Sequence, residues 1–468
     1  MVFSSLSFLI VFLPVLLAFY FLTPVRFRRM RNLILLVFSL AFYGCAGLQF
    51  LPLMLVSVII HYIGGLLCGS KRKTIRRIGL WGAALLGLGL LGYFKYAGFF
   101  VRSINALGAS LTVPDITLPI GISFFTFQGL SYVVDVYRGD AAAQRNPLKV
   151  ALYISLFPQL VAGPIVRYTT VAAEIDNRCE TIPEFSAGAQ RFCIGLGKKM
   201  LLANGISAVA DAAFGASAPS AAFAWLGALA YTLQIYFDFS AYSDMAIGLG
   251  RMFGFHFLEN FNYPYIADSV TDFWRRWHIS LSTWFRDYVY IPLGGNRCTP
   301  ARHIFNLFTV WFLTGLWHGA SWNFVCWGLW YFLLLLGEKY VWGSVLARCP
   351  AAARHIYTML AVMLGWVLFR AEGLPAAMDY LRAMFGANGV VSGQTIYCIL
   401  EYWLEWLLGL VAVFPVAGAV QKKLAARDGK FATAVLDLGP KLLALVLLAL
   451  SYMALVSGSF NPFIYFRF

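Results

Sequence analysis

Apolar runs long enough to cross a bilayer follow one another along this chain, and short loops that carry basic residues separate them. Three of these runs are 4–22, 51–67 and 80–100. A transmembrane helix needs about 20 consecutive, mainly apolar residues, whereas the strands of a membrane barrel alternate over about ten residues. Only 12% of the residues are charged, about half of the share found in soluble proteins. The sequence therefore predicts an all-α polytopic membrane protein with about ten to twelve transmembrane helices, together with re-entrant or interfacial helices.

The basic residues of the first 80 positions gather in two short loops, at 26–31 and 71–77. Lys and Arg accumulate in the cytoplasmic loops of membrane proteins. Both loops therefore predict a multi-pass protein whose amino terminus is periplasmic. The net charge of +15 needs no other explanation, because the basic residues lie scattered between apolar runs and form no module of domain size. We therefore expect no nucleic acid among the partners.

The segment 268–295, DSVTDFWRRWHISLSTWFRDYVYIPLGG, is rich in both aromatic and basic residues. On a single helix its aromatic side chains share one arc, while Arg275 and Arg286 fall on the opposing side with Arg276 beyond them. Such a helix lies in the membrane interface, with its guanidinium groups toward water or anionic head groups. An interfacial anchor accounts for nearly all of this pattern. It does not account for His278, which the same helical wheel places at the edge of the apolar arc.

A second unusual segment holds His318 in the middle of a run, 304–337, that carries no formal charge. Ionisable residues at such depth are costly, and by default they suggest a function. Gly315 and Gly319 flank the histidine and allow a close backbone approach or a break in the helix. A buried histidine also occurs as hydrogen-bonded packing, and this interpretation stays open. Two inward-facing histidines, 40 residues apart, nevertheless suggest one site.

Three broken or polar stretches indicate an interior cavity. Glycine and proline interrupt the runs 119–137 and 148–166, and the run 221–249 carries a polar stripe. Irregular backbone at membrane depth survives only where protein or a water-filled cavity surrounds it. We expect the chamber to be lined by polar residues of these runs and by residues near the two histidines, namely Trp274, Trp277, Trp311, Trp317, Trp322, Asn323, Gln128 and Asp238.

The other histidines and the eight cysteines show no metal-ligand spacing. No two cysteines form a CxxC pair, and the sequence contains no phosphate-binding glycine loop and no GxSxG elbow. His303 adjoins a loop arginine, and we expect it to be solvated. The sequence therefore predicts neither a metal site nor a bound cofactor.

Six longer motifs stand out along the chain: LPIGISFFTFQGLSYVVDVYRG, LFPQLVAGPI, YFDFSAYSDMAIGLG, FWRRWHISLSTWFRDYVYIPLGG, LTGLWHGASWNFVCWGLWY and the closing NPFIYFRF. Together they resemble the membrane-bound O-acyltransferase family, and within it the bacterial branch that acetylates alginate. The resemblance covers nearly the whole chain. It implies one integral-membrane domain over 1–468, in which tilted helices surround a central tunnel. A peripheral four-helix bundle would occupy 1–101, the core with the reaction chamber 118–337, and further helices 338–468.

The resemblance also implies a reaction. An acyl group, in the simplest case acetyl, would pass from a cytoplasmic thioester to a hydroxyl of a cell-envelope or exported polysaccharide. The donor would be acetyl-CoA or an acyl carrier protein thioester, and a periplasmic SGNH-type acyltransferase partner could receive the group first. By this resemblance His318 is the catalytic base and His278 the second catalytic histidine. Arg275, Arg276 and Arg286 are candidates for contact with the donor phosphates. The protein would act among the lipids of the bacterial inner membrane.

Two interpretations from other functional classes remain. A transporter or flippase of a lipid-linked saccharide would use the same cavity, with the two histidines as proton relays or head-group contacts. A structural scaffold for a cell-envelope complex would need neither histidine. Release of a free thiol from a thioester donor distinguishes acyl transfer from both.

Overall fold

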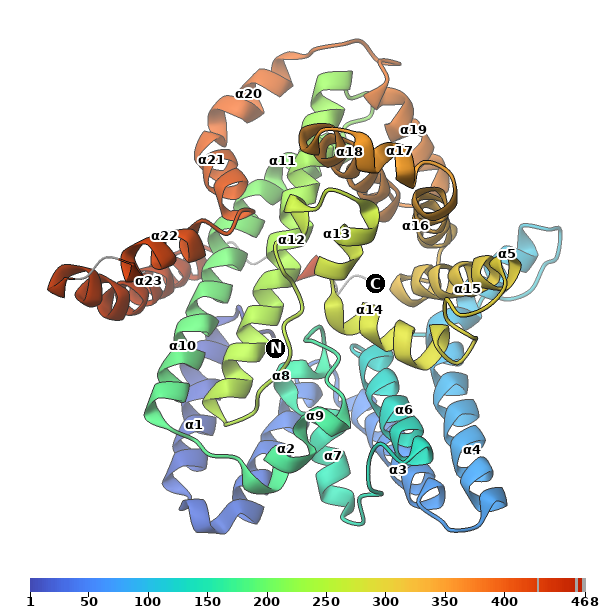
Figure 1. The fold of residues 1–468 in the computed structure, drawn as a ribbon, viewed down its shortest axis with the longest axis vertical. Helices are drawn as coiled ribbons and strands as arrows, with labels where there is room; N and C mark the ends of the chain where they lie inside the picture. Colours follow the sequence, from blue (N-terminus) through green and yellow to red (C-terminus); the bar gives the residue numbers. More distant parts are fainter. Residues whose placement is uncertain (427–428, 459–461, 465–468) are drawn as a thin grey trace. The chain divides into compact units, whose positions relative to one another are not determined.

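The structure is a computed structural model that describes residues 1–426, 429–458 and 462–464. Within these residues every regular element is a helix, from α1 (Leu13–Leu22) to α23 (Lys430–Val456), and no strand occurs (Figure 1). This architecture confirms the all-α membrane protein that the apolar runs predict. Of the closing motif NPFIYFRF, positions 462–464 are described, whereas 461 and 465–468 lie outside the described residues.

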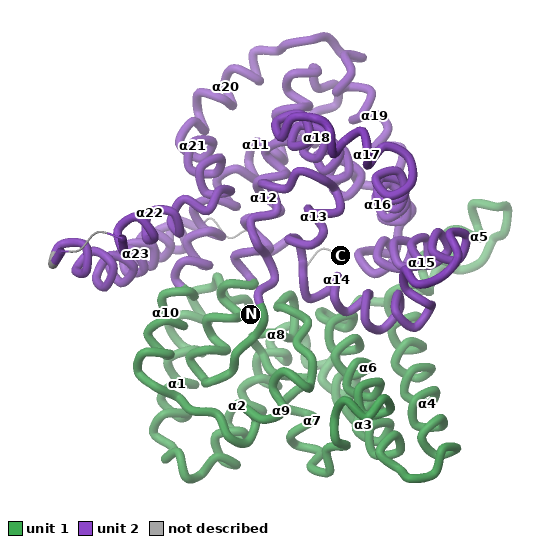
Figure 2. Tube along the Cα trace, in the orientation of Figure 1, with its two compact units in different colours: residues 1–192, 243–258 green, residues 193–242, 259–468 purple. Residues whose placement is uncertain are grey.

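The chain forms two compact units (Figure 2). Unit 1 contains residues 1–192 and 243–258, and unit 2 contains 193–242 and 259–468. The expected peripheral bundle, residues 1–101, lies within unit 1, and residues 338–468 belong to unit 2. The expected core, 118–337, contributes to both units.

In unit 1, helices α3 (Leu51–Cys68), α4 (Lys73–Leu91) and α6 (Ile122–Arg138) pack against one another. Helix α6 is buried on nearly every side, because apolar side chains surround its whole circumference. Gln128 lies in the middle of this helix and is completely buried. Neither polar atom of its amide has a hydrogen-bond partner among the described residues.

Among the residues that the structure describes, five helical segments are long and apolar enough to cross a membrane, and the number rises to seven if each of two sharply bent helix pairs counts as one span. The five segments are Leu48–Cys68, Lys73–Asn105, Ile182–Gly215, Ala351–Arg370 and Phe431–Val456. This criterion uses length and composition alone, and short or polar helices in the middle of the chain do not meet it. The number of ten to twelve spans stays a prediction.

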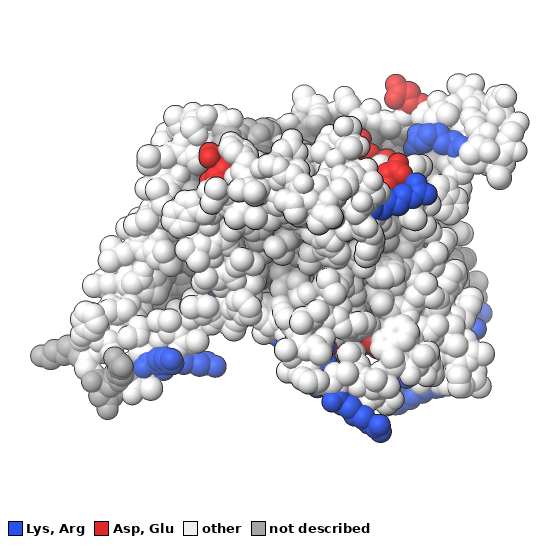
Figure 3. All heavy atoms as spheres, turned by 90° about the horizontal axis from the view of Figure 1, so that it is seen from above, with Lys and Arg blue, Asp and Glu red and all other residues white. Residues whose placement is uncertain are grey.

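The surface around these helices is unusually apolar. In α23, for example, only 11% of the most apolar window is buried, and Leu442, Leu445 and Met453 are exposed. The face drawn in Figure 3 shows a few charged groups on a surface that is otherwise uncharged. Apolar surfaces of this extent are typical of contact with lipid rather than water.

In unit 2, helices α15 (Pro300–His318) and α16 (Trp322–Tyr340) cross at close range. Glycines make this approach possible: a Cβ atom at Gly315 would lie 2.5 Å from the carbonyl oxygen of Phe324, and one at Gly328 would lie 2.3 Å from that of Trp311. Any larger residue at either position would push the helices apart. The crossing holds His318, the last residue of α15, against α16.

Candidate active site

The segment that the sequence predicts as one interfacial helix is broken at His278. Helix α13 (Val270–Arg276) ends before the histidine, α14 (Ile279–Phe285) begins after it, and a π-helical turn follows at Arg286–Tyr290. His278 itself has φ 44° and ψ 54°, a left-handed conformation that is uncommon for any residue with a side chain. The prediction of a single helix is therefore wrong. Such strained positions gather at functional sites.

The side chain of Asn260 stabilises this break. Its Oδ1 atom accepts hydrogen bonds from the Ser280 N–H (3.2 Å), the Ser280 hydroxyl (2.9 Å) and His278 Nδ1 (3.1 Å). The Asn260 carbonyl oxygen also accepts from the Ile279 N–H at 3.0 Å. Asn260, 18 positions before His278, thus accepts hydrogen bonds from the backbone N–H groups at the start of α14 and orients the imidazole.

These hydrogen bonds also determine which nitrogen of His278 carries the proton. Because a backbone N–H donates to Asn260 Oδ1, that atom is the amide oxygen, and Nδ1 of His278 must donate to it. The lone pair therefore lies on Nε2, which is buried and has no hydrogen-bond partner among the described residues. Burial lowers the pKa of His278 to about 3, so the ring is neutral at physiological pH. In this tautomer Nε2 can accept a proton but cannot donate one to an oxyanion.

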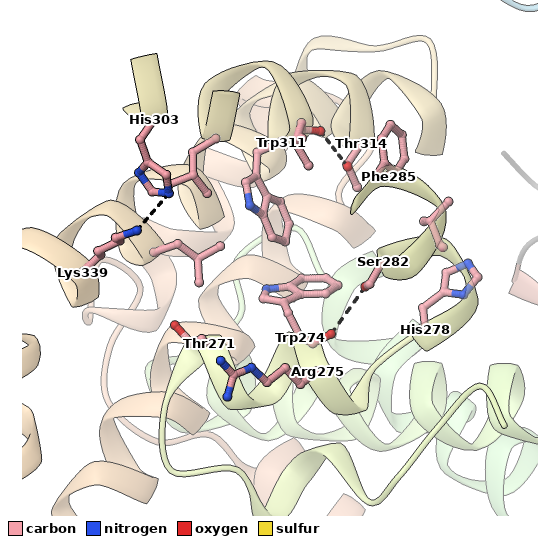
Figure 4. Close-up of a pocket in the computed structure, with 14 residues that line it drawn as sticks. Thr271, Trp274, Arg275, His278, Ser282, Phe285, His303, Trp311, Thr314 and Lys339 are labelled. Atoms are coloured by element: carbon pink, nitrogen blue, oxygen red, sulfur yellow. Dashed lines mark hydrogen bonds between the residues drawn. The ribbon is translucent and has the colours of Figure 1, made fainter. Parts of the chain in front are cut away.

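His278 lines a cavity of about 310 Å³ inside unit 2 (Figure 4). The walls are mainly apolar and include Trp274 and Trp311. The figure shows Arg275, His303 and Lys339 toward one end of the cavity and His278 toward the other. The cavity therefore has a basic end, near Arg275 and Lys339, and an opposite end at His278.

His303 differs from its prediction as a solvated residue. It is buried, with Nε2 3.0 Å from Lys339 Nζ and Nδ1 2.9 Å from the Tyr340 hydroxyl. The imidazole and the ammonium group share the basic end of the cavity. The adjacent loop arginine misled the sequence interpretation, because it says nothing of the contacts with α16.

His318 lies in the aromatic core of unit 2 and is 4% exposed. Its ring packs edge-on against Trp327, Phe369 and Trp317, with centroid distances of 4.8, 5.2 and 5.0 Å. Trp317 in turn lies 5.9 Å from the His278 ring. The two histidines that the sequence singles out thus contact one and the same tryptophan, within one unit.

Aromatic rings separate His318 from two cavities. Trp327 contacts both Trp274 and Trp311, which line the first cavity. Phe369 lines a second cavity, of about 440 Å³, together with Asn323. Two successive rings, Trp327 and then Trp274 or Trp311, therefore lie between His318 and the first cavity, whereas the single ring of Phe369 lies between His318 and the second.

The three candidate arginines have different surroundings. Arg275 lines the first cavity. Arg276 pairs with Asp272 at 2.7 Å, and the exposed Arg286 pairs with its neighbour Asp287 at 2.7 Å. The geometry favours Arg275 over the other two as a contact for a ligand in this cavity.

The remaining predicted chamber residues are dispersed. Trp277 is buried against Trp366, Trp322 is 54% exposed at the start of α16, and Gln128 lies in unit 1. Asp238 forms a buried ion pair with Lys199, at 2.5 Å, and its other oxygen accepts the Ile464 N–H at 2.7 Å.

Sequence analysis missed Asn260, Lys199 and Lys339. Lys199 had a signal, because a cation inside an apolar run must find a partner. Asn260 and Lys339 had none, since their roles depend on residues distant in sequence. No group of His, Cys, Asp and Glu that could hold a metal occurs in the stretches of the chain that the structure describes.

Comparison with known proteins identifies the chain's relatives. The model of the membrane-bound O-acyltransferase family matches residues 140–374. The protein named probable alginate O-acetylase AlgI of Azotobacter vinelandii is 41% identical over 502 aligned positions, covering 100% of both chains. The peptidoglycan O-acetyltransferase of Helicobacter pylori is 34% identical over 83% of this chain and 81% of its own. The teichoic acid D-alanyltransferase of Bacillus subtilis is 28% identical over 53% of this chain and 71% of its own. With matches of this extent, the chain belongs to the membrane-bound O-acyltransferase family and is an O-acyltransferase.

Proposed function

We propose that this protein takes an acetyl group from a cytoplasmic thioester and passes it across the inner membrane for O-acylation of a cell-envelope or exported polysaccharide. Relatives are named for alginate, peptidoglycan and teichoic acid, which are polymers of this kind. The observation that carries the proposal is the pair of buried histidines around Trp317, next to a cavity whose far end is basic. Such a cavity suits a donor that is anionic at one end and carries a reactive carbonyl at the other.

The donor would place its phosphate-bearing end near Arg275 and Lys339, with the thioester toward His278. Coenzyme A and the phosphopantetheine arm of an acyl carrier protein both have this polarity. Guanidinium and ammonium groups bind phosphate through charge-assisted hydrogen bonds. In this proposal the thioester is itself a substrate, and the reaction needs no further cofactor.

In the proposed chemistry, His318 acts as the base. The acceptor hydroxyl oxygen attacks the thioester carbonyl, and the imidazole takes the hydroxyl proton. A C–O bond forms, the C–S bond breaks, and the proton passes to the leaving thiolate, which departs as a free thiol. A positioned base of this kind contributes about 10²–10⁴-fold to the rate. Through the lone pair on its Nε2 atom, His278 would relay the proton from His318 to the leaving thiolate.

The acceptor would be the polysaccharide itself or a periplasmic SGNH-type acyltransferase that passes the group on. The orientation of the chain follows from the loops 26–31 and 71–77, which we assign to the cytoplasm. A reporter that fluoresces only in the cytoplasm should therefore be active when fused within 71–77. Labelling of a cysteine in this loop by an impermeant reagent in intact cells would contradict the assignment.

Thiol release tests the function directly. The purified chain, supplied with acetyl-CoA or with an acetylated acyl carrier protein, should release free thiol and form an O-acetyl ester on an added acceptor. A flippase or a scaffold would release none. Absence of thiol release with both donors from a folded protein would reject the proposal.

The same assay tests the basic end of the cavity. Replacing Arg275 with alanine removes a charge-assisted contact, so the apparent KM for the donor should rise about ten- to a hundredfold while kcat is largely kept. Arg286→Ala is the matched control, because this exposed arginine pairs with Asp287 and should leave the donor KM unchanged. Equal donor KM values in both variants would show that Arg275 does not contact the donor.

A further inference from the structure

The second cavity of unit 2 has a lining unlike the first. It measures about 440 Å³ and lies where α12 (Ala221–Met252), the start of α16 and the end of α18 (Ala351–Arg370) meet. Its polar lining residues include Gln234, Asn323, Arg370 and Glu372. The mechanism proposed above assigns no ligand to it.

Two buried amide oxygens line this cavity without hydrogen-bond partners among the described residues: Oδ1 of Asn323 and Oε1 of Gln234. Asn323 is 2% exposed and Gln234 is 7% exposed. The orientation of Asn323 is determined, because its Nδ2 donates to the carbonyl oxygens of Leu368 (3.2 Å) and Ala371 (3.1 Å). Its Oδ1 is therefore the atom left for a ligand. A buried acceptor that is left unsatisfied carries the penalty of its lost hydration, and a ligand that donates to it removes this penalty.

The charges of the cavity do not favour an anionic ligand. The Arg370 guanidinium pairs with Asp211 at 2.7 Å and lies over the rings of Phe214 and Tyr231. Glu372 adds a carboxylate to the lining. The two unpartnered amide oxygens therefore favour a neutral ligand that donates hydrogen bonds, and an alcohol is such a ligand.

Aromatic rings complete the lining. Phe324 and Phe369 lie 5.1 Å apart, edge to face, and both border the cavity. Aromatic faces beside planar amide groups suit a sugar ring, which presents apolar C–H faces and hydroxyl edges. Phe369 also contacts the His318 ring at 5.2 Å, so the cavity lies one ring from the proposed base.

We propose that this cavity binds the acyl acceptor as a saccharide, and that Gln234 and Asn323 position it by accepting hydrogen bonds from its hydroxyl groups. The inference rests on the proposed acyl transfer and names where its second substrate enters. In this arrangement the acceptor cavity lies one aromatic ring, Phe369, from His318.

The test uses the full-length purified chain with acetyl-CoA or the acetylated carrier protein. Alginate trisaccharide and a disaccharide of peptidoglycan glycan serve as saccharide probes, and a serine-containing peptide serves as the polypeptide probe. Gln234→Met removes the acceptor oxygen at nearly constant volume. For the saccharide probe that the wild-type chain acetylates, this substitution should raise the acceptor KM about three- to tenfold, the effect of one neutral hydrogen bond, with a smaller change in kcat. Gln190→Met makes the same chemical change in unit 1, where this side chain bonds to Ser186, and should leave the KM unaltered.

Asn323→Ala is the second variant, and its melting temperature is recorded because the amide also holds the backbone of α18. Calorimetric binding of the saccharide to a His318→Ala background measures affinity without turnover, and Gln234→Met should weaken it equally. Unchanged saccharide affinity in both variants overturns the inference while leaving acyl transfer intact. Acetylation of the serine peptide alone, or of neither saccharide, also overturns it. Failure of the wild-type chain to release thiol would instead reject the proposed function.

Discussion

His318→Ala should reduce acyl transfer by about 10²–10⁴-fold, the usual contribution of a positioned general base. The residue is buried among Trp317, Trp327 and Phe369, whose side chains cannot replace the imidazole as a proton acceptor. The measurement is the rate of O-acetyl ester formation by the purified variant. A small residual rate is expected, since binding of both substrates in one site still accelerates the reaction.

A conservative variant separates the proton transfer from packing. His318→Gln keeps most of the side-chain volume between the three rings but cannot act as a base, so its activity should be as low as that of the alanine variant. His256→Ala is the control, because His256 is an exposed histidine of unit 1 that bonds to Glu174 and should not affect transfer. Full transfer by a folded His318→Gln protein would contradict the assignment.

Asp238→Asn should lower the free energy of unfolding by about 3–5 kcal/mol, the usual cost of breaking a buried ion pair from one side. The carboxylate and Lys199 are each 2% exposed, so the substitution leaves an ammonium charge buried without its counterion. The substitution also weakens the hydrogen bond to the Ile464 N–H, and Lys199 donates in turn to the Pro462 carbonyl oxygen. Denaturant unfolding in detergent measures the loss, and faster proteolysis near 462–464 should accompany it.

Two further variants test this explanation. Replacing both partners by apolar residues, Lys199→Met with Asp238→Leu, should recover much of the stability, because no charge then remains buried. Asp437→Asn removes one side of the exposed Lys441–Asp437 pair and should change stability little. Wild-type stability in Asp238→Asn would show that the pair contributes nothing to the fold.

The fold class could be predicted because it depends on local sequence. Runs of apolar residues about 20 long specify helices in lipid without reference to the rest of the chain. The sequence also singles out His278 and His318 for a local reason, because each is an ionisable group in an apolar stretch; their shared catalytic role stays a prediction. Both histidines indeed contact Trp317.

The geometry of the site could not be predicted, because distant residues determine it. Helical periodicity predicts one continuous helix over 274–288. The helix instead breaks at His278, where the side chain of Asn260 accepts the hydrogen bonds that a continuous helix would make within itself. Burial of His303 likewise depends on Lys339 and Tyr340, which lie 36 and 37 residues away. Asp238 belonged to a polar stripe in the sequence, yet its partner Lys199 lies on another segment. Hydrophobic patterns carry no information on such pairings.

The left-handed backbone at His278 lowers the stability of the fold at the residue that the proposed mechanism uses as a proton relay. Glycine adopts φ 44° without steric cost, whereas any side chain at this position holds the backbone in a conformation it rarely adopts. Selection for a robust fold alone would therefore favour glycine at this position, and the proton relay that we propose for His278 would oppose this change. In the proposed mechanism, a homologue that carries glycine at this position would have a more relaxed turn but no proton acceptor there.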